Sequence, residues 1–196
     1  MKKEIIFMHI PKTGGASIGQ LCMSNRIGAI GHNTRNPNYV SLAQYKRSHP
    51  DIFSFSIVRN PWDRLVSAYH FLSQGGLNAD DSKDANKYVN RYSGFNEFIS
   101  GAFKDDAILT QIHFRPQHEW ISDENNVIAD YVGKFEDLQH HISACLALVG
   151  LPDYQLPHVN KATHKHYKQY YSKESIDIVE TIYSRDIELF DYTYHG

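Results

Sequence analysis

A glycine-containing turn near the N-terminus has the composition of an anion-binding site. It lies between an expected strand and an expected helix and reads Pro11-Lys12-Thr13-Gly14-Gly15-Ala16-Ser17. Glycines let backbone N–H groups approach an anion closely, and the start of a helix adds positive potential. Thr13 and Ser17 can donate hydroxyl hydrogen bonds, and Lys12 adds a full charge. Because the lysine precedes the glycines, this is not a Walker A motif for a magnesium nucleoside triphosphate. The alternative is a glycine-rich turn with a solvated lysine.

A second candidate anion site follows a β-rich stretch in the first third of the chain. Arg59 stands at the carboxyl end of that stretch, and Asn60 has the residue type of a helix N-cap. Ser67 follows Asn60 by about two helical turns, so both side chains point to the same side. An arginine fork and a serine hydroxyl together suit a terminal phosphate. The alternative is a surface Arg–Asp pair, in which Arg59 or Arg64 contacts Asp63.

Strands and helices alternate along the chain. We expect strands at 4–10, 27–30, 52–58 and 127–132, helices at 16–25, 39–49, 61–73, 137–149 and 172–190, and a polar loop at 74–93. This alternation predicts a mostly parallel sheet flanked by helices, in which ligands bind at the carboxyl ends of the strands. On that rule the segments 11–17, 31–35 and 59–67 are the places to look for a site.

Composition narrows the class of protein. A chain of 196 residues with a hydrophobic fraction of 41% can bury one sizeable core, so we expect a single domain over 1–196. A formal net charge of −2 argues against a nucleic-acid coat or a polybasic membrane binder. No stretch approaches the roughly 20 apolar residues of a membrane span, and the N-terminus lacks a signal-peptide core. We expect Cys22 and Cys145 to be buried free thiols in a cytoplasmic protein, the alternative being a single disulfide between them.

Together the two candidate anion sites resemble those of PAPS-dependent sulfotransferases, where PAPS is 3′-phosphoadenosine 5′-phosphosulfate. Residues 9–17 are similar to that family's 5′-phosphosulfate loop, and residues 58–69 to its 3′-phosphate motif. More narrowly, they resemble the carbohydrate branch that includes heparan sulfate 2-O-sulfotransferases and bacterial relatives. Weaker similarities extend almost to the end of the chain. The resemblance implies a three-layer α/β fold of the P-loop type, with a central, mostly parallel sheet between helices.

The resemblance also implies roles for individual residues. The loop at 11–17 would hold the 5′-phosphosulfate, Lys12 would neutralise charge on the leaving phosphate oxygen, and Arg59 with Ser67 would bind the 3′-phosphate. Ala16 replaces a frequent hydroxyl residue, a loss that backbone donors should cover. A late basic loop would close over the nucleotide, with candidates Asn160, Lys161, Thr163, Lys165 and Lys168. The implied product is adenosine 3′,5′-bisphosphate. No metal is required, because the lysine, the arginine and helix N-termini can supply the positive charge.

The chain contains twelve histidines, and sulfuryl transfer to a hydroxyl needs a base beside the nucleophile. His32 directly follows the second expected strand, in the loop that carries a catalytic histidine in the resembled branch. We therefore predict His32 as the general base, with Glu119 and Asp63 as fallbacks. The alternative is a loop histidine that only contacts substrate. His9 is expected to be a packing residue next to the first loop. Residues expected to contact the acceptor, a small molecule or carbohydrate, are Arg35, His113, Arg115 and Gln117.

Two other classes of function are compatible with the sequence. A small-molecule or nucleoside kinase would need magnesium-binding carboxylates and a lysine after the glycines, and neither is evident. A nucleotide-binding module could keep the PAPS pocket without transfer activity. Turnover on the true acceptor separates such a module from an enzyme.

Overall fold

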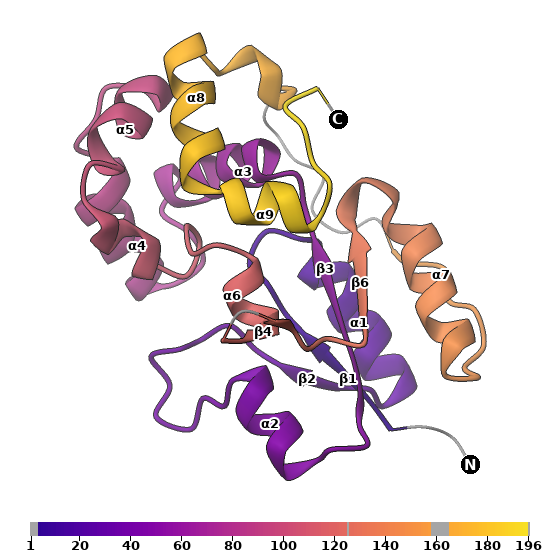
Figure 1. Cartoon of the computed structure of the whole chain (residues 1–196). Helices are drawn as coiled ribbons and strands as arrows, with labels where there is room; N and C mark the ends of the chain where they lie inside the picture. Colours follow the sequence, from indigo (N-terminus) through magenta and orange to yellow (C-terminus); the bar gives the residue numbers. More distant parts are fainter. Residues whose placement is uncertain (1–3, 125, 158–164, 196) are drawn as a thin grey trace. The chain divides into compact units, whose positions relative to one another are not determined.

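The computed structural model describes residues 4–124, 126–157 and 165–195 (Figure 1). The chain divides into two compact units, each built from two stretches of sequence. The first unit comprises the described residues of Met1–Arg59 and Gln117–Lys161, and the second those of Asn60–Pro116 and Ala162–Gly196. The chain thus passes from the first unit to the second directly after Arg59. A single domain over 1–196 stays a prediction.

A parallel sheet organises the first unit. Its strand order is β2-β1-β3-β6, with the bounds Gly28–Ile30, Ile5–Met8, Phe53–Val58 and Tyr131–Lys134. Every residue of the two central strands, β1 and β3, is buried, as expected for strands covered on both faces. All three strand pairs are parallel, which confirms the predicted α/β class and parallel sheet. The fourth strand begins at Tyr131 rather than at 127.

Helices flank this sheet. They are α1 (Gly15–Asn25), α2 (Leu42–Ser48) and α7 (Leu138–Leu148). The core joins the strands to α1 and α7: Phe7 and Phe55 pack with ring centroids 5.0 Å apart, beside Ile18 and Ile142. Shorter elements complete the unit: α6 (His118–Ile121), β4 (Ser122–Asp123), β5 (Asn126–Val127) and the 3-10 turn η3 (Phe135–Asp137).

Both cysteines belong to this core. Cys22 on α1 and Cys145 on α7 are buried and free, as the sequence predicts. Burial raises the pKa of the Cys22 thiol to about 11. Burial, and then the neighbouring Cys22, raise the pKa of Cys145 to about 12. Both thiols are therefore protonated at neutral pH and act as small apolar side chains.

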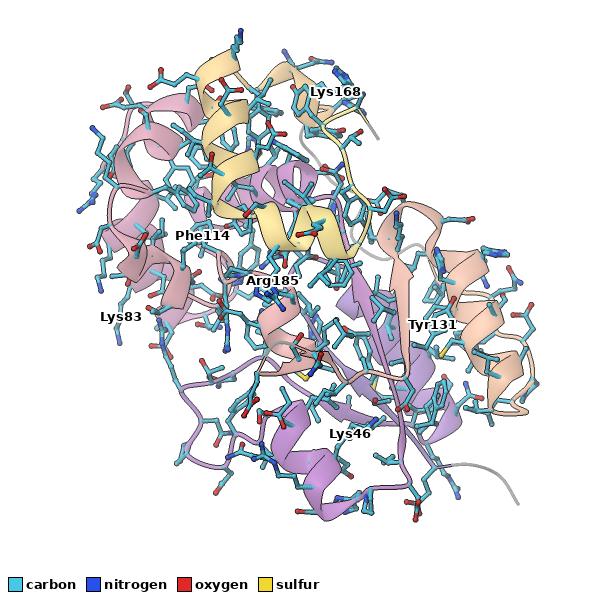
Figure 2. All side chains as sticks on the ribbon, in the orientation of Figure 1. Lys46, Lys83, Phe114, Tyr131, Lys168 and Arg185 are labelled. Atoms are coloured by element: carbon cyan, nitrogen blue, oxygen red, sulfur yellow. The ribbon has the colours of Figure 1, made fainter. Side chains whose placement is uncertain are left out.

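The second unit is helical and aromatic. Its elements are α3 (Pro61–Ser73), α4 (Ala79–Asp84), the π-helical turn η1 (Ala85–Val89), α5 (Phe95–Ala102), the 3-10 turns η2 (Asp106–Thr110) and η4 (Tyr167–Gln169), α8 (Lys173–Ile182) and α9 (Ser184–Leu189). Phe98 and Phe114 are fully buried at its centre, where Figure 2 labels Phe114. None of the helices in the described ranges is long and apolar enough to cross a bilayer.

Helix α3 has the predicted bounds because local chemistry fixes its start. The Oδ1 of Asn60 accepts hydrogen bonds from the N–H groups of Trp62 and Asp63. Pro61 occupies the first helical position, where its missing N–H costs nothing. Leu65 and Leu72, on one side of the helix, then pack into the aromatic core, with Tyr69 against it.

The prediction of a loop over 74–93 is wrong, because α4 and η1 lie there. Asn78 caps α4 by accepting from the N–H groups of Asp80 and Asp81. Ala85 and Val89 are buried in the aromatic core of the second unit. Two small apolar anchors in a polar stretch are a weak periodic signal, so tertiary packing decides this helix.

The closing helix expected at 172–190 is two helices, α8 and α9, with a break at Tyr183. Tyr183 is 2% exposed, and its hydroxyl donates to the carbonyl oxygen of Phe114 at 2.6 Å. One face of this segment is apolar, and its residues Val179 and Tyr183 are buried in the core.

Candidate functional site

The turn between β1 and α1 forms a closed loop with backbone donors at its helical end. Lys12 and Gly14 have φ values of 69° and 88°, in the left-handed region. The buried hydroxyl of Thr13 donates to the carbonyl oxygen of Ile10 at 2.9 Å, which ties the two sides of the loop together. Ala16, in the first turn of α1, is exposed. That turn contains no acidic side chain. A loop of this kind can hold an anion.

Each glycine of the loop has its own structural reason. Gly14 needs its left-handed φ of 88°, and a Cβ there would lie 3.2 Å from the Phe135 ring. A Cβ on Gly15 would come within 1.8 Å of Nε2 of His9, so no other residue fits without moving that imidazole. The sequence suggested anion approach as the reason for the glycines. Packing against Phe135 and His9 is a second reason.

Ser17 and Thr13 both use their hydroxyl hydrogens within the protein. Ser17 Oγ donates to the carbonyl oxygen of Pro157 at 2.8 Å, and Thr13 donates to Ile10. A hydroxyl has one hydrogen to donate, so either side chain would change partner to donate to an anion. Their contact with a phosphosulfate stays a prediction. Of the five candidates for the late loop, Asn160, Lys161 and Thr163 lie outside the described residues.

Arg59 is held at this loop by two kinds of contact. Its Nη1 donates to the carbonyl oxygen of Lys12 at 3.1 Å, and its guanidinium carbon lies 4.3 Å from the centroid of the Phe135 ring. β1 and β3 are neighbours in the sheet, and β2 lies on the other side of β1, so strand order switches here. Such switch points are the usual ligand sites of open parallel sheets. Arg59, from the second predicted anion motif, therefore lies at the first predicted motif within the first unit.

Gln117 fixes the backbone of Arg59. Its Oε1 accepts from the Arg59 N–H and its Nε2 donates to the Arg59 carbonyl oxygen, both at 2.8 Å. The side chain of Gln117 is fully buried. This places Gln117 as a support for Arg59, whereas the sequence suggested a contact with the acceptor.

His32 follows β2 and pairs with His9, which follows β1. Their Nδ1 atoms are 3.1 Å apart, and the ring planes meet at 82°. Burial lowers the pKa of His9 to about 3, and the charges of His32 and Lys12 act in the same direction. His9 was expected to be a packing residue. The structure adds a direct hydrogen bond to the predicted base.

The other predicted residues are spread over both units. Arg35 is exposed, in the first unit. Ser67 on α3 and the buried His113 belong to the second unit. His113 Nδ1 lies 3.0 Å from the side-chain nitrogen of Gln111. Their joint action with Arg59 or His32 stays a prediction.

The alternative of a surface Arg–Asp pair is wrong for Arg64. Arg64 is 2% exposed, and its Nη2 donates to the carbonyl oxygens of Arg115 at 2.7 Å and His113 at 3.3 Å. It therefore ties α3 to the chain segment that contains Arg115. Arg59 is also buried, at 7% exposure.

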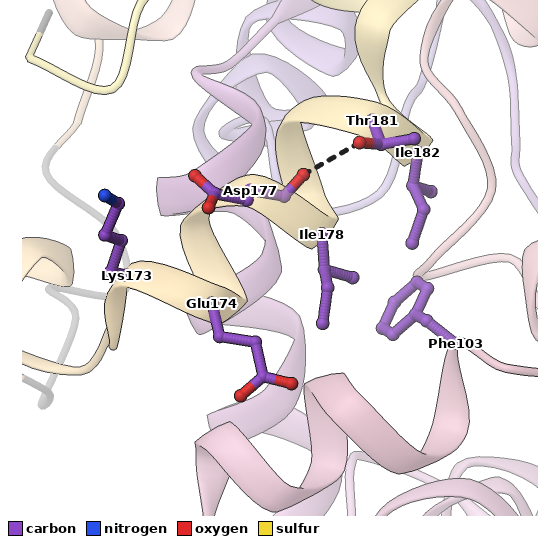
Figure 3. Close-up of a pocket in the computed structure, with 7 residues that line it drawn as sticks. All are labelled: Phe103, Lys173, Glu174, Asp177, Ile178, Thr181 and Ile182. Carbon is purple, nitrogen blue, oxygen red and sulfur yellow. Dashed lines mark hydrogen bonds between the residues drawn. The ribbon is translucent and has the colours of Figure 1, made fainter.

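A groove along α8 in the second unit has a different character (Figure 3). It encloses about 610 Å³ between Phe103 and the side chains of α8, including Ile178 and Ile182. Its charged residues are Lys173, Glu174 and Asp177, so one cation faces two carboxylates. None of the predicted site residues lines it, and a polyanionic ligand would not suit it.

Comparison with known proteins gives a match to one protein family over almost the whole chain. Residues 1–193 match the family described as "Sulfotransferase family". A protein of Archaeoglobus fulgidus named "Uncharacterized protein" is 27% identical over 115 residues, which are 59% of this chain and 82% of that protein. No solved structure matches the chain significantly. The family match spans both candidate anion motifs and both histidines of the pair.

Proposed function

Since this chain belongs to the sulfotransferase family and is therefore a transferase for sulfuryl groups, we propose that its donor is PAPS, its acceptor a carbohydrate hydroxyl and its general base His32. The observation that carries the proposal is the contact between Arg59 and the carbonyl oxygen of Lys12. It holds Arg59, to which we assign the 3′-phosphate, at the loop to which we assign the 5′-phosphosulfate, and the 3′-phosphate is what distinguishes PAPS from ordinary adenine nucleotides.

The residues of the loop fit a donor with phosphate and sulfate groups. The first turn of α1 contains no acidic side chain, and the left-handed Gly14 opens the backbone at the helix start. Lys12 adds a full positive charge next to the backbone N–H groups at the start of α1. Arg59, whose guanidinium contacts the loop, would bind the 3′-phosphate together with Ser67.

The chemistry follows from positioning and charge. When bound, the donor supplies a sulfuryl group whose bond to the 5′-phosphate breaks as the acceptor oxygen bonds to sulfur. Lys12 would stabilise the negative charge that develops on the phosphate oxygen. His32 would take the proton of the acceptor hydroxyl, because a neutral imidazole is a base near neutral pH. The products would be the sulfated acceptor and adenosine 3′,5′-bisphosphate.

A thermal-shift comparison tests the donor assignment. Adenosine 3′,5′-bisphosphate should raise the melting temperature more than AMP or magnesium ATP does, because a ligand specific for the native state stabilises it by about 2.7 kcal/mol at 100 times its dissociation constant. Arg59→Ala should reduce the shift to that of AMP. Arg47→Ala is the matched control, because Arg47 is an exposed arginine paired with Asp123. Equal shifts for all three nucleotides would contradict the proposal.

The role of His32 has its own test. His32→Ala should abolish most of the turnover on a carbohydrate acceptor and leave the shift by adenosine 3′,5′-bisphosphate unchanged. Unchanged turnover would remove His32 as the base. A wild-type protein that binds the nucleotide and transfers nothing to any acceptor tested would favour a binding module.

A further inference from the structure

His9 and His32 are brought together by the sheet. β1 and β2 are parallel with Met8 opposite Ile30, so the same register continued by one residue brings His9 beside Gly31, which directly precedes His32. The backbone N–H of His9 donates to the carbonyl oxygen of Ile30 at 3.0 Å. The two rings then meet edge to face with centroids 4.5 Å apart and Nδ1 atoms 3.1 Å apart. Strand register therefore holds this pair.

The other sides of His9 are enclosed as well. Its ring stacks on Phe7 with centroids 5.6 Å apart and an interplanar angle of 24°. Its Nε2 edge lies against the first turn of α1, in the space that a side chain at Gly15 would need. The titratable and charged groups that act on His9 are His32 and Lys12, and with burial they lower its pKa to about 3. His9 therefore stays uncharged at neutral pH and carries one ring proton.

Where each ring carries a single proton, two arrangements give one hydrogen bond between the two Nδ1 atoms. In the first, His9 donates from Nδ1, and His32 must hold its own proton on Nε2. In the second, His32 donates from Nδ1, and its Nε2 keeps a lone pair. Because the Nδ1 of His32 faces His9, only Nε2 is left to accept a proton from a substrate hydroxyl. A general base at position 32 therefore requires the second arrangement.

We propose that His9 is the positioning residue of His32: its Nδ1 accepts the Nδ1–H of His32 and keeps the lone pair of His32 on Nε2. The inference rests on the proposed role of His32 as the base. In this arrangement the single ring proton of His9 lies on Nε2, at the start of α1. An N–H at that place favours an anion in the loop, whereas a lone pair would repel it. Gly15 is the residue that leaves room for this edge of the ring.

Nitrogen-15 NMR of the histidine rings tests the proposal without any turnover. At neutral pH the wild-type protein, with signals assigned by His9→Phe and His32→Gln, should show His32 protonated at Nδ1 and unprotonated at Nε2. His9 should be protonated at Nε2. The reverse tautomers would overturn the proposal. This spectrum decides the matter even where a His9 variant fails to fold.

Two variants of His9 sharpen the test. His9→Phe keeps a ring against Phe7 and removes the acceptor, so the Nδ1–H form of His32 should lose population. His9→Asn places an amide oxygen near the lost Nδ1 and should restore that form. A His32 tautomer that is identical in all three proteins would overturn the proposal.

Steady-state kinetics of the same two variants test whether the tautomer of His32 matters for turnover. His9→Phe should lower kcat on the order of tenfold or more, with the donor KM changed less than kcat, and His9→Asn should recover part of the loss. A shifted tautomer with unchanged kcat would overturn the positioning role. Failure of the proposed function is a separate result, because His32→Ala would then keep its turnover while the wild-type tautomers stay as inferred.

Discussion

Two edges of the same parallel sheet hold cationic side chains in different surroundings. At the amino edge of β3 and β6, Lys46 lies 2.7 Å from the carboxylate of Asp130 and donates to the carbonyl oxygen of Ile128 at 2.9 Å. At the carboxyl edge of β1 and β3, Arg59 donates to the carbonyl oxygen of Lys12 and lies over the Phe135 ring. These two partners of Arg59 have no formal charge.

The difference separates a structural cation from one suited to a ligand. Partial burial alone would raise the pKa of the Asp130 carboxyl, but hydrogen bonds from Lys46 and Ser54 hold it below its ordinary value. The positive charge of Lys46 is thereby paired with the carboxylate of Asp130. The carbonyl oxygen and the aromatic ring orient the guanidinium of Arg59, and neither of these two partners carries the formal charge that Asp130 brings to Lys46.

Replacing the lysine at each edge should produce the largest difference in kcat between the two edges. Lys12→Ala should lower kcat on the order of 10²–10³-fold and weaken nucleotide binding less, because a positive charge at a developing anion acts mainly in the transition state. Steady-state kinetics and the thermal shift by adenosine 3′,5′-bisphosphate measure the two effects. Lys46→Ala is the matched control, since it should lower stability and leave kcat unchanged. Normal rates in Lys12→Ala would contradict the leaving-group role.

Replacing Gln117, at the carboxyl edge, should affect both the stability of the fold and the nucleotide preference. Gln117→Ala leaves the buried N–H and carbonyl of Arg59 without these partners, at a cost of about 1–3 kcal/mol for each group. The preference for adenosine 3′,5′-bisphosphate over AMP should shrink as well. Urea unfolding and thermal shifts measure these effects.

Gln111 provides the control for this change. It is also buried, and its amide donates to Asp84 at 3.1 Å in the second unit. Gln111→Ala should lower stability and keep the nucleotide preference. An equal loss of preference in both variants would show that Gln117 has no special relation to Arg59.

Lowering the pH should reduce the contribution of Asp130, at the amino edge, to the free energy of unfolding. The Asp130 pKa is lower in the folded protein than its ordinary value of 3.8, so its contribution to stability is complete above that value and is lost as the pH falls through the folded pKa. Asp130→Asn should lower stability by about 1 kcal/mol at neutral pH, since the carboxylate is partly exposed. Its unfolding free energy should also vary less with pH below about 4. If the unfolding free energies of the wild-type protein and of Asp130→Asn varied with pH in parallel, this account would be contradicted.

The smallest effect is expected for an exposed pair on the same helix as Lys46. Arg47 lies 2.9 Å from Asp123, with 66% of the arginine side chain exposed. Exposed ion pairs contribute about 0–1 kcal/mol, so Arg47→Ala should change the unfolding free energy by less than about 0.5 kcal/mol. A loss above 1 kcal/mol in urea unfolding would mean that this contact belongs with the Lys46 network.

Local features of the fold were predictable because neighbouring residues create them. The N-cap at Asn60 with Pro61 next to it sets the start of α3 without any distant contact. The glycine loop between β1 and α1 likewise follows from residues adjacent in sequence. By contrast, α4 and η1 were missed, since their apolar anchors Ala85 and Val89 depend on a core formed by other helices.

The sequence by itself determined the parallel α/β sheet and placed Lys12, His32 and Arg59 at the carboxyl ends of strands. Only the tertiary structure decided what holds them there. His9 meets His32 across 23 positions of sequence and Gln117 meets Arg59 across 58. The pairing of β1 with β2 creates the first contact, and the position of the residue before α6 beside the end of β3 creates the second. A polar side chain has no periodic signature for such a partner, because the partner's place depends on how every strand between them pairs.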